Sequence, residues 1–450
     1  MAVEERRHFG VLSFTGAGHL NAMVALGLGL QERGHQVTFF EKPKIERRIR
    51  EAGLDFYAIA RQDSPFKGKG PGAFPAGGVL SEWRTFRFNI RRIAHDLESY
   101  FQETEPALLE SGVDALIVNE IAITGPTLAE LLRLPYFIVS TSVPHNFGWD
   151  AYLTFSGYRY RRSWWSHFAA AELEVSAVRM HGPIRSVVNR YRAERGLEAV
   201  DGVPATYPPL AQVAQLPECL DLPRRELPDY FQYAGPFTRE GARSEVDFAW
   251  DRLDGRPVIY ASLGTTRNAR ADILRLIAEA CVDLDAQLVI TLGGRFDSAI
   301  CESWPGDPVV AEFVPQLEIL KRASLVITHG GPNTVFETLR EGKPMVAIPI
   351  AHDQPAIATR LERQGIAEVL PVMRLSAQMI REAVVKVLTI PSYRRAAAEM
   401  QRNLCTLDGV GRAAEIIENS LKHEAKGKSS RRGFDVSEAL LQTLTSSRGN

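Results

Sequence analysis

The sequence predicts an α/β protein with two doubly wound, Rossmann-like domains that face each other across a cleft. Its 450 residues are too many for one hydrophobic core and fit two domains of ordinary size. Short apolar runs alternate with helical patterns in the first half, and the same alternation restarts after a stretch that bears Pro and Gly. We therefore expect domains at residues 1–235 and 256–421, a linker at 236–255 and a disordered tail at 422–450.

Apolar runs in the first half predict buried strands, and helical periodicity predicts the helices between them. The strands are expected at Val11–Phe14, Gln36–Phe40, Ala115–Val118 and Tyr136–Val139. The helices are expected at Leu20–Arg33, with Met23, Leu26 and Leu30 on one face, and at about Thr124–Arg133. Strands that alternate with helices indicate a parallel sheet covered on both faces.

The second half repeats this pattern. Strands are expected at Val258–Leu263, Gln287–Leu292, Leu325–Thr328 and Met345–Ile348, and helices at about Ala271–Asp283, Asn333–Glu341 and Gln354–Gln364. Asp283 and Asp285 form a DxD sequence, but its place between a helix and a buried strand indicates a structural boundary rather than a metal site. Ligands of doubly wound sheets bind at the carboxyl ends of the strands, so each domain should provide one wall of the cleft.

The composition excludes several classes of function. The net charge of −1 gives no field that favours nucleic acid, and no apolar run approaches the roughly 18 residues that span a bilayer. The N-terminus shows no signal-peptide pattern. The 4 cysteines are widely spaced and form no CxxC pair, which indicates reduced thiols in a cytoplasmic protein and no structural zinc.

Sequence elements that follow strands of the second domain carry residues suited to a nucleotide-sugar. Glycines let the backbone approach a ligand closely, and a helix N-terminus offers free N–H groups to a pyrophosphate. Phe313 offers a flat face to a base, and Glu337 can accept from both ribose hydroxyls. We expect the donor to be bound by Ser262, Gly264, Thr265, Phe313, Val314, Gln316, His329, Gly331, Asn333, Thr334, Glu337, Asp353 and Gln354.

Residues 15–21, with the sequence TGAGHLN, connect the first strand to the first helix and place His19 at the carboxyl edge of the first sheet. A reaction that joins a hydroxyl to an anomeric carbon needs a base, and histidine, with an ordinary pKa of about 6.5, suits neutral pH. A helix-capping histidine is the structural alternative. His35 precedes a strand at the far edge, so we expect a structural role for it.

FVPQ at 313–316, HGGPNTVFE at 329–337 and PIAHDQ at 349–354 resemble the donor signature of the UDP-glycosyltransferase family, which has the GT-B fold. The resemblance extends to about residue 420 and is greatest to carotenoid glucosyltransferases of the zeaxanthin type. It implies inverting transfer of a hexose from a UDP-sugar co-substrate, without a metal or another cofactor. Gln354 implies glucose as the sugar.

The resemblance also implies roles for single residues. Phe313 would stack on uracil, and Gln316 and Glu337 would hold the ribose. The phosphates would be held by His329, Asn333 and Thr334, and the sugar by Asp353 and Gln354. His19 would be the catalytic base. The family usually orients this base with an Asp, but Asn119 stands at that position and Glu120 follows it. Either Glu120 supports His19, or Asn119 does so more weakly.

An aromatic-rich stretch at residues 147–168 follows the strand that ends near Ser140, and it can cover an apolar acceptor. Ordinary domain packing explains the stretch equally well. We expect acceptor contacts from Phe147, Trp149 and Ser140. Basic residues such as Lys42 can rest peripherally on an anionic membrane, with a solvated surface as the alternative.

Other functions compete with a carotenoid acceptor. Flavonoid-like phenols are the main alternative within the same fold, and a lipid-linked peptidoglycan precursor fits the donor segment poorly. A catalytically weak nucleotide-sugar-binding protein is the alternative from another class. Asn119 favours that last hypothesis, whereas His19 and the donor motifs oppose it.

Overall fold

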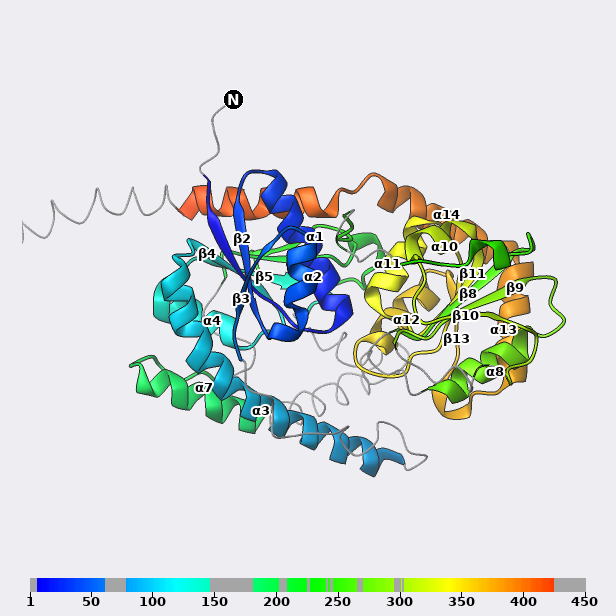
Figure 1. Ribbon diagram of the computed structural model, residues 1–450, viewed down its shortest axis with the longest axis horizontal. Coiled ribbons are helices and arrows are strands. Elements are labelled where there is room, and N and C mark those ends of the chain that lie inside the picture. Colours follow the sequence, from blue (N-terminus) through cyan, green and yellow to red (C-terminus); the bar gives the residue numbers. More distant parts are fainter. Residues whose placement is uncertain are drawn as a thin grey trace, which may run out of the picture.

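The computed structural model describes residues 6–60, 78–145, 181–201, 209–224, 227–239, 242, 246–264, 270–294, 301 and 303–424, with the backbone alone at 78–87 and 89. Two parallel sheets lie side by side, each covered by helices (Figure 1). The prediction of two α/β domains is confirmed.

The first sheet is 7-stranded and parallel, in the order β3-β2-β1-β4-β5-β6-β7. Its strands are β1 (His8–Leu12), β2 (Gln36–Glu41), β3 (Asp55–Ala58), β4 (Ala115–Asn119), β5 (Tyr136–Ser140), β6 (Ala211–Ala214) and β7 (Phe231–Tyr233). Its helices are α1 (Ala17–Glu32), α2 (Glu46–Glu51), α3 (Gly78–Ser111), α4 (Thr124–Leu132) and α7 (Gly182–Glu194), with 3₁₀ turns at Pro43–Ile45 and Glu218–Leu220. Every residue of β4 is buried, as a central parallel strand requires.

The second sheet is 6-stranded and parallel, in the order β10-β9-β8-β11-β12-β13. Its strands are β8 (Val258–Ser262), β9 (Gln287–Thr291), β10 (Val309–Ala311), β11 (Ala323–Thr328), β12 (Met345–Ala347) and β13 (Ala367–Val369). Its helices are α8 (Ala271–Cys281), α10 (Gln316–Arg322), α11 (Pro332–Arg340), α12 (Gln354–Arg363), α13 (Ala377–Thr389) and α14 (Pro391–Cys405), with 3₁₀ turns at Trp250–Arg252 and Val372–Arg374. Asp283 lies between α8 and β9, at the structural boundary that was expected.

The first strand ends earlier than its apolar run predicts. Residues 8–12 pair in register with residues 36–40 of β2, so the sheet ends at Leu12. Phe14 therefore stands outside the sheet, with 45% of its surface exposed. A large apolar side chain left exposed at the carboxyl edge of a parallel sheet is placed to meet a ligand.

The last described helix, residues 409–424, returns to the first domain and covers α1 (Figure 1, orange to red). Gly29 of α1 permits a close approach, because a Cβ there would lie 2.2 Å from Val410 Cγ1. Val410, Ala413 and Ile417 are fully buried in the core of the first domain. This helix packs with the first domain, although we assigned the sequence up to residue 421 to the second.

His35 has the structural role that its position predicts. Its Nε2 lies 3.1 Å from a carboxylate oxygen of Glu418 in the returning helix. Arg33 donates two hydrogen bonds to the same carboxylate, at 2.6 and 2.7 Å. These contacts anchor the returning helix to the end of α1 and the start of β2.

The two domains meet at the carboxyl ends of their strands, where α1 contacts α11. A buried ion pair between Asp221 and Arg360 joins them a second time, at 2.6 Å. None of the 4 cysteines, all of which lie in the described ranges, forms a disulfide. Within the described ranges, no helix has both the length and the apolarity needed to cross a membrane.

Candidate active site

The candidate site lies where the first turn of α1 meets the N-terminus of α11. Asn333, in the first turn of α11, donates from Nδ2 to the carbonyl oxygen of Gly18 at 2.5 Å. Its Oδ1 accepts from Gln215 Nε2 at 3.1 Å. Asn333, an expected phosphate ligand, thus fixes the first turn of α1, which carries His19, against the N-terminus of α11.

His19 lies at this junction as predicted, partly buried, with its Nδ1 2.6 Å from the hydroxyl oxygen of Thr141. Burial lowers the pKa of His19 below its ordinary value, and the carboxylate of Asp353 acts in the opposite direction. The ring is therefore neutral at pH 7 and can accept a proton. The edge of the ring meets Phe14, with centroids 5.6 Å apart.

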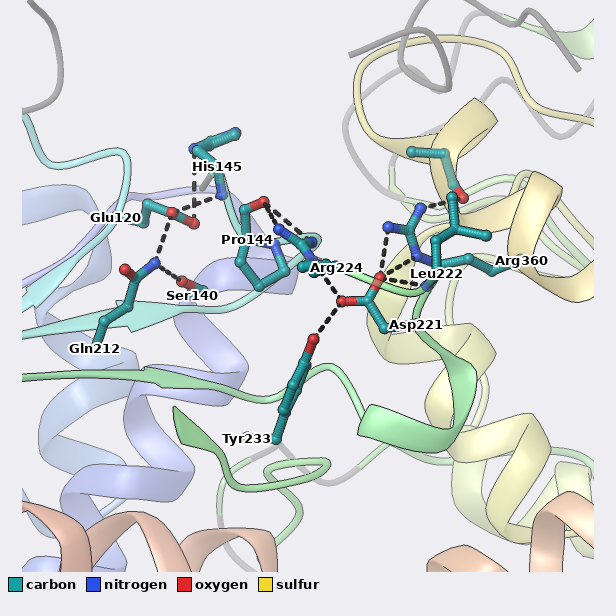
Figure 2. Close-up of polar contacts among 11 residues, drawn as sticks. Glu120, Ser140, Pro144, His145, Gln212, Asp221, Leu222, Arg224, Tyr233 and Arg360 are labelled. Atoms are coloured by element: carbon teal, nitrogen blue, oxygen red, sulfur yellow. Dashed lines mark hydrogen bonds and ion pairs between the residues drawn. The ribbon is translucent and has the colours of Figure 1, made fainter. Parts of the chain in front are cut away.

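The expectation that Asn119 or Glu120 contacts the His19 ring directly is wrong. Asn119 reaches it only through Thr141, whose hydroxyl oxygen accepts from Asn119 Nδ2 at 3.0 Å. Glu120 instead accepts from the backbone N–H of His145 at 2.7 Å, and its other oxygen lies 3.6 Å from His145 Nδ1 (Figure 2). Glu120 therefore orients a second histidine, not His19.

Ser140 does not line the cleft, so its predicted contact with the acceptor is wrong. The residue is fully buried, and its hydroxyl accepts from Gln212 Nε2 at 2.9 Å (Figure 2). Gln212 Nε2 also donates to Glu120 at 3.1 Å. Ser140 thus belongs to the polar network beneath Glu120.

His329 follows β11 and packs against two glycines of the donor motifs. A Cβ at Gly264 or at Gly331 would lie 2.6 or 2.5 Å from His329 Nε2, so only glycine leaves room for the ring at these positions. Burial lowers the pKa of His329 to about 4. The ring is therefore neutral, and its buried Nδ1 has no hydrogen-bond partner within the described residues. Ser262, at the end of β8, is buried nearby.

The side chains expected to hold a nucleoside lie together at the starts of α10 and α11. Phe313 is 43% exposed, as a stacking surface must be, whereas Val314 beside it is buried. Gln316 Nε2 donates to Glu337 at 2.7 Å, so the two residues assigned to the ribose are in contact. Thr334 is also buried at this place.

The residues expected to read the sugar precede and begin α12. Asp353 forms a hydrogen bond with the hydroxyl of Ser142 in the first domain. Its charge acts on both His19 and His329. Gln354 accepts from the backbone N–H groups of residues 350 and 351, at 2.8 and 2.9 Å, which shapes the loop before α12. Thr265, Phe147 and Trp149 lie outside the described residues.

Two regions of the chain match models of known families. Residues 12–143 match the glycosyltransferase family 28 N-terminal domain, and residues 275–409 match the erythromycin biosynthesis protein CIII-like C-terminal domain. The chain is 29% identical over 426 residues to a zeaxanthin glucosyltransferase of Pantoea ananas, covering 91% of this chain and 95% of the relative. It is 24% identical over 427 residues to the NDP-glycosyltransferase YjiC of Bacillus subtilis, covering 94% and 99%.

Solved structures of the same fold cover nearly the whole chain. The calicheamicin glycosyltransferase CalG4 is similar, with a TM-score of 0.72 and 21% identity over 93% of this chain and 99% of that one. The glycosyltransferase VinC in complex with dTDP has a TM-score of 0.66 and 19% identity, over 92% and 100%. The chain is a glycosyltransferase with the GT-B fold.

The glycosyltransferase site contains residues that motif reading missed. Thr141 and Ser142 directly follow β5 and contact His19 and Asp353. Gln215 follows β6 and donates to the carbonyl of Thr141 as well as to Asn333. Phe14 follows β1. Each stands just after the carboxyl end of a strand, and that position is the one sequence signal that could have identified them.

Proposed function

We propose that this glycosyltransferase transfers a hexose, with glucose expected, from a UDP-sugar to a hydroxyl of a small apolar acceptor such as a carotenoid. One observation carries the proposal. The successive residues Thr141 and Ser142 hold His19 of the first domain and Asp353 of the second domain at one place. A base for the acceptor and a carboxylate for the sugar then meet where the two substrates must react.

The proposed reaction uses His19 as the base. The acceptor oxygen attacks the anomeric carbon from the face opposite the nucleotide, and its proton passes to Nε2 of the neutral imidazole. The bond between the anomeric carbon and the diphosphate oxygen breaks, and UDP leaves with the electron pair. The N-terminus of α11 and its neighbouring donors are placed to receive that charge. The product has inverted configuration.

Replacing Phe313 with alanine should weaken the affinity for UDP about 10-fold, because stacking of a base on an aromatic ring contributes about 1–3 kcal/mol. Titration calorimetry with UDP measures the change. Leu317 offers a matched control, since it is also an exposed apolar residue, 39% exposed, in α10 just after Phe313. Leu317→Ala should leave the affinity unchanged, and equal losses in both variants would contradict the stacking role.

Similarity and exposure support an apolar acceptor. The chain is 29% and 28% identical to two proteins named zeaxanthin glucosyltransferase, from Pantoea ananas and Pseudescherichia vulneris. Phe14 presents an exposed ring beside His19. Lys42, Arg47 and Arg50 each pair with an acidic side chain, which favours a solvated surface over membrane contact.

A phenolic acceptor is the second candidate, and one observation favours it. Within the described residues, the His19 ring meets a threonine hydroxyl where the family commonly has a carboxylate. A phenol is more acidic than an aliphatic alcohol and needs less help from its base. The experiment that tests both candidates is incubation with UDP-glucose and a panel of carotenoid and flavonoid acceptors, with products identified by mass. Absence of any glycosylated product would favour a binding protein with weak catalysis.

EDTA should change the rate of transfer little, because the reaction proposed here uses α11, His329 and their neighbours for the phosphates rather than a metal ion. The assay compares initial rates with and without chelator. Activity that disappears with EDTA and returns with a divalent cation would contradict this prediction.

A further inference from the structure

The His19 ring contacts the hydroxyl group of Thr141, and the other hydrogen-bond partner of that hydroxyl limits where its proton can point. Thr141 is 3% exposed, and its Oγ1 lies 2.6 Å from His19 Nδ1 and 3.0 Å from Asn119 Nδ2. Asn119 Oδ1 accepts from the backbone N–H of Ile121 at 3.2 Å, which turns the NH₂ group of the amide towards Thr141. Asn119 therefore donates to Thr141 and cannot accept from it.

The protons of this network can be counted. A threonine hydroxyl has one proton and two acceptor sites, and Asn119 occupies one of those sites. When the Thr141 proton points to His19 Nδ1, the neutral ring carries its own proton on Nε2, and Nε2 cannot then accept one. For catalysis the hydroxyl must rotate and accept from Nδ1–H. A hydroxyl can play both parts, whereas an apolar side chain can play neither.

We propose that Thr141 is the positioning residue of His19, and that Asn119 acts on His19 only through Thr141. The inference rests on the proposed role of His19 as base. Thr141 holds the ring plane and accepts from Nδ1–H when the imidazolium forms. With Asn119 donating to the same oxygen, the rotated hydroxyl proton has no acceptor among the described side chains. An aspartate at position 119 would provide that acceptor.

The backbone of Thr141 is fixed independently of its hydroxyl. Its carbonyl accepts from Gln215 Nε2, which also donates to Asn333. Asn333 in turn donates to the carbonyl of Gly18, directly before His19. These hydrogen bonds link the backbone of Thr141 to the residue before His19 without using the Thr141 side chain. Replacing the hydroxyl should therefore leave the first turn of α1 and the donor site in place.

The test measures kcat and KM for UDP-glucose and for the acceptor that gives most product, together with the Kd of UDP. Thr141→Val, which is nearly isosteric, should lower kcat about 10-fold with KM and Kd unchanged, because the interaction strengthens only as the imidazolium forms. Thr141→Ser should recover most of that loss. Asn119→Asp should raise kcat about 10-fold, and it should not do so in the Thr141→Val background.

Thr104→Val is the matched control, since Thr104 is fully buried in α3 and its hydroxyl has no hydrogen-bond partner among the described residues. If His19→Ala is slow but Thr141→Val is as fast as the unchanged protein, the positioning role of Thr141 is overturned, whereas the role of His19 as the base is supported. If His19→Ala keeps full turnover, the base and the positioning role both fall. A gain from Asn119→Asp that persists without the threonine hydroxyl overturns the route through Thr141. Should Thr141→Val fail to fold, an unchanged kcat in Asn119→Asp overturns the proposal.

Discussion

Replacing His19 with alanine should lower turnover by about 10² to 10⁴ and leave the affinity for UDP nearly unchanged, because a general base contributes in the transition state and not to donor binding. Burial lowers the pKa of His19, so the neutral ring, which is the active form of the base, predominates at pH 7. Steady-state kinetics with UDP-glucose and calorimetry with UDP measure the two quantities separately.

The dependence of kcat/KM on pH gives an independent test of His19 as the base. A neutral base loses activity as the pH falls through its pKa, so the acid limb of kcat/KM should lie below the ordinary histidine value of about 6.5. Burial is the main cause of this shift, and the charges of Asp353, His145 and His352 act on the same ring to a smaller extent. His19→Ala should abolish the limb. Loss of UDP affinity with preserved turnover would show that His19 serves the donor.

Asp221→Asn should destabilise the protein by about 3 kcal/mol, the scale on which breaking a buried ion pair leaves an uncompensated charge. The side chain of Asp221 is 2% exposed, and it accepts from Arg360 at 2.6 and 2.9 Å and from Arg224 at 2.7 Å (Figure 2). Tyr233 adds a hydrogen bond of 2.8 Å. Arg360 is fully buried, so solvent cannot stabilise its positive charge once the carboxylate is lost. Chemical denaturation measures the loss.

A second effect of Asp221→Asn concerns the donor. Arg360 lies in α12, directly after the loop that carries Asp353, so the affinity for UDP-glucose should fall as well. Asp254→Asn is the matched control, because Asp254 also pairs with an arginine, at 2.7 Å, but both groups are exposed. That control should unfold at nearly the same denaturant concentration as the unchanged protein. Equal effects of both substitutions would contradict the buried-pair argument.

The stabilisation of the fold by Asp221 should be lost at acid pH. Burial alone would raise the pKa of this carboxyl, but Arg360 and Arg224 outweigh burial and hold the pKa below its ordinary value. A carboxyl with a depressed pKa stabilises the fold above its unfolded value of about 3.9 and loses that stabilisation as the pH falls through the folded value. The pair is therefore fully effective at neutral pH.

The central strands and the donor motifs could be predicted from the sequence, because continuous burial leaves a run of apolar residues and the motifs directly follow such runs. β3, β6, β7, β10 and β13 were missed. These strands are short and lie at or near a sheet edge, where fewer positions are apolar. The central strands β1, β4, β5, β8 and β11 position most of the site, but the missed strand β6 precedes Gln215, which was missed with it.

The partner of His19 could not be predicted, because neighbouring residues of a strand point to opposite faces. Asn119 ends β4 and faces Thr141, whereas Glu120 faces the other side together with Ser140. The sequence alone does not say which face meets His19. The role of Thr141 depends further on the orientation of the Asn119 amide, which a hydrogen bond to Ile121 decides.

The returning helix has a consequence for how this protein is made. Residues 409–424 complete the core over α1, yet they are synthesised after the whole second domain. The first domain therefore leaves the ribosome with the apolar surface of α1 around Gly29 uncovered, although domains generally fold in order from the N-terminus. A fragment ending before residue 409 would keep that surface exposed permanently. For a newly made chain, the exposure lasts until the final segment emerges and docks.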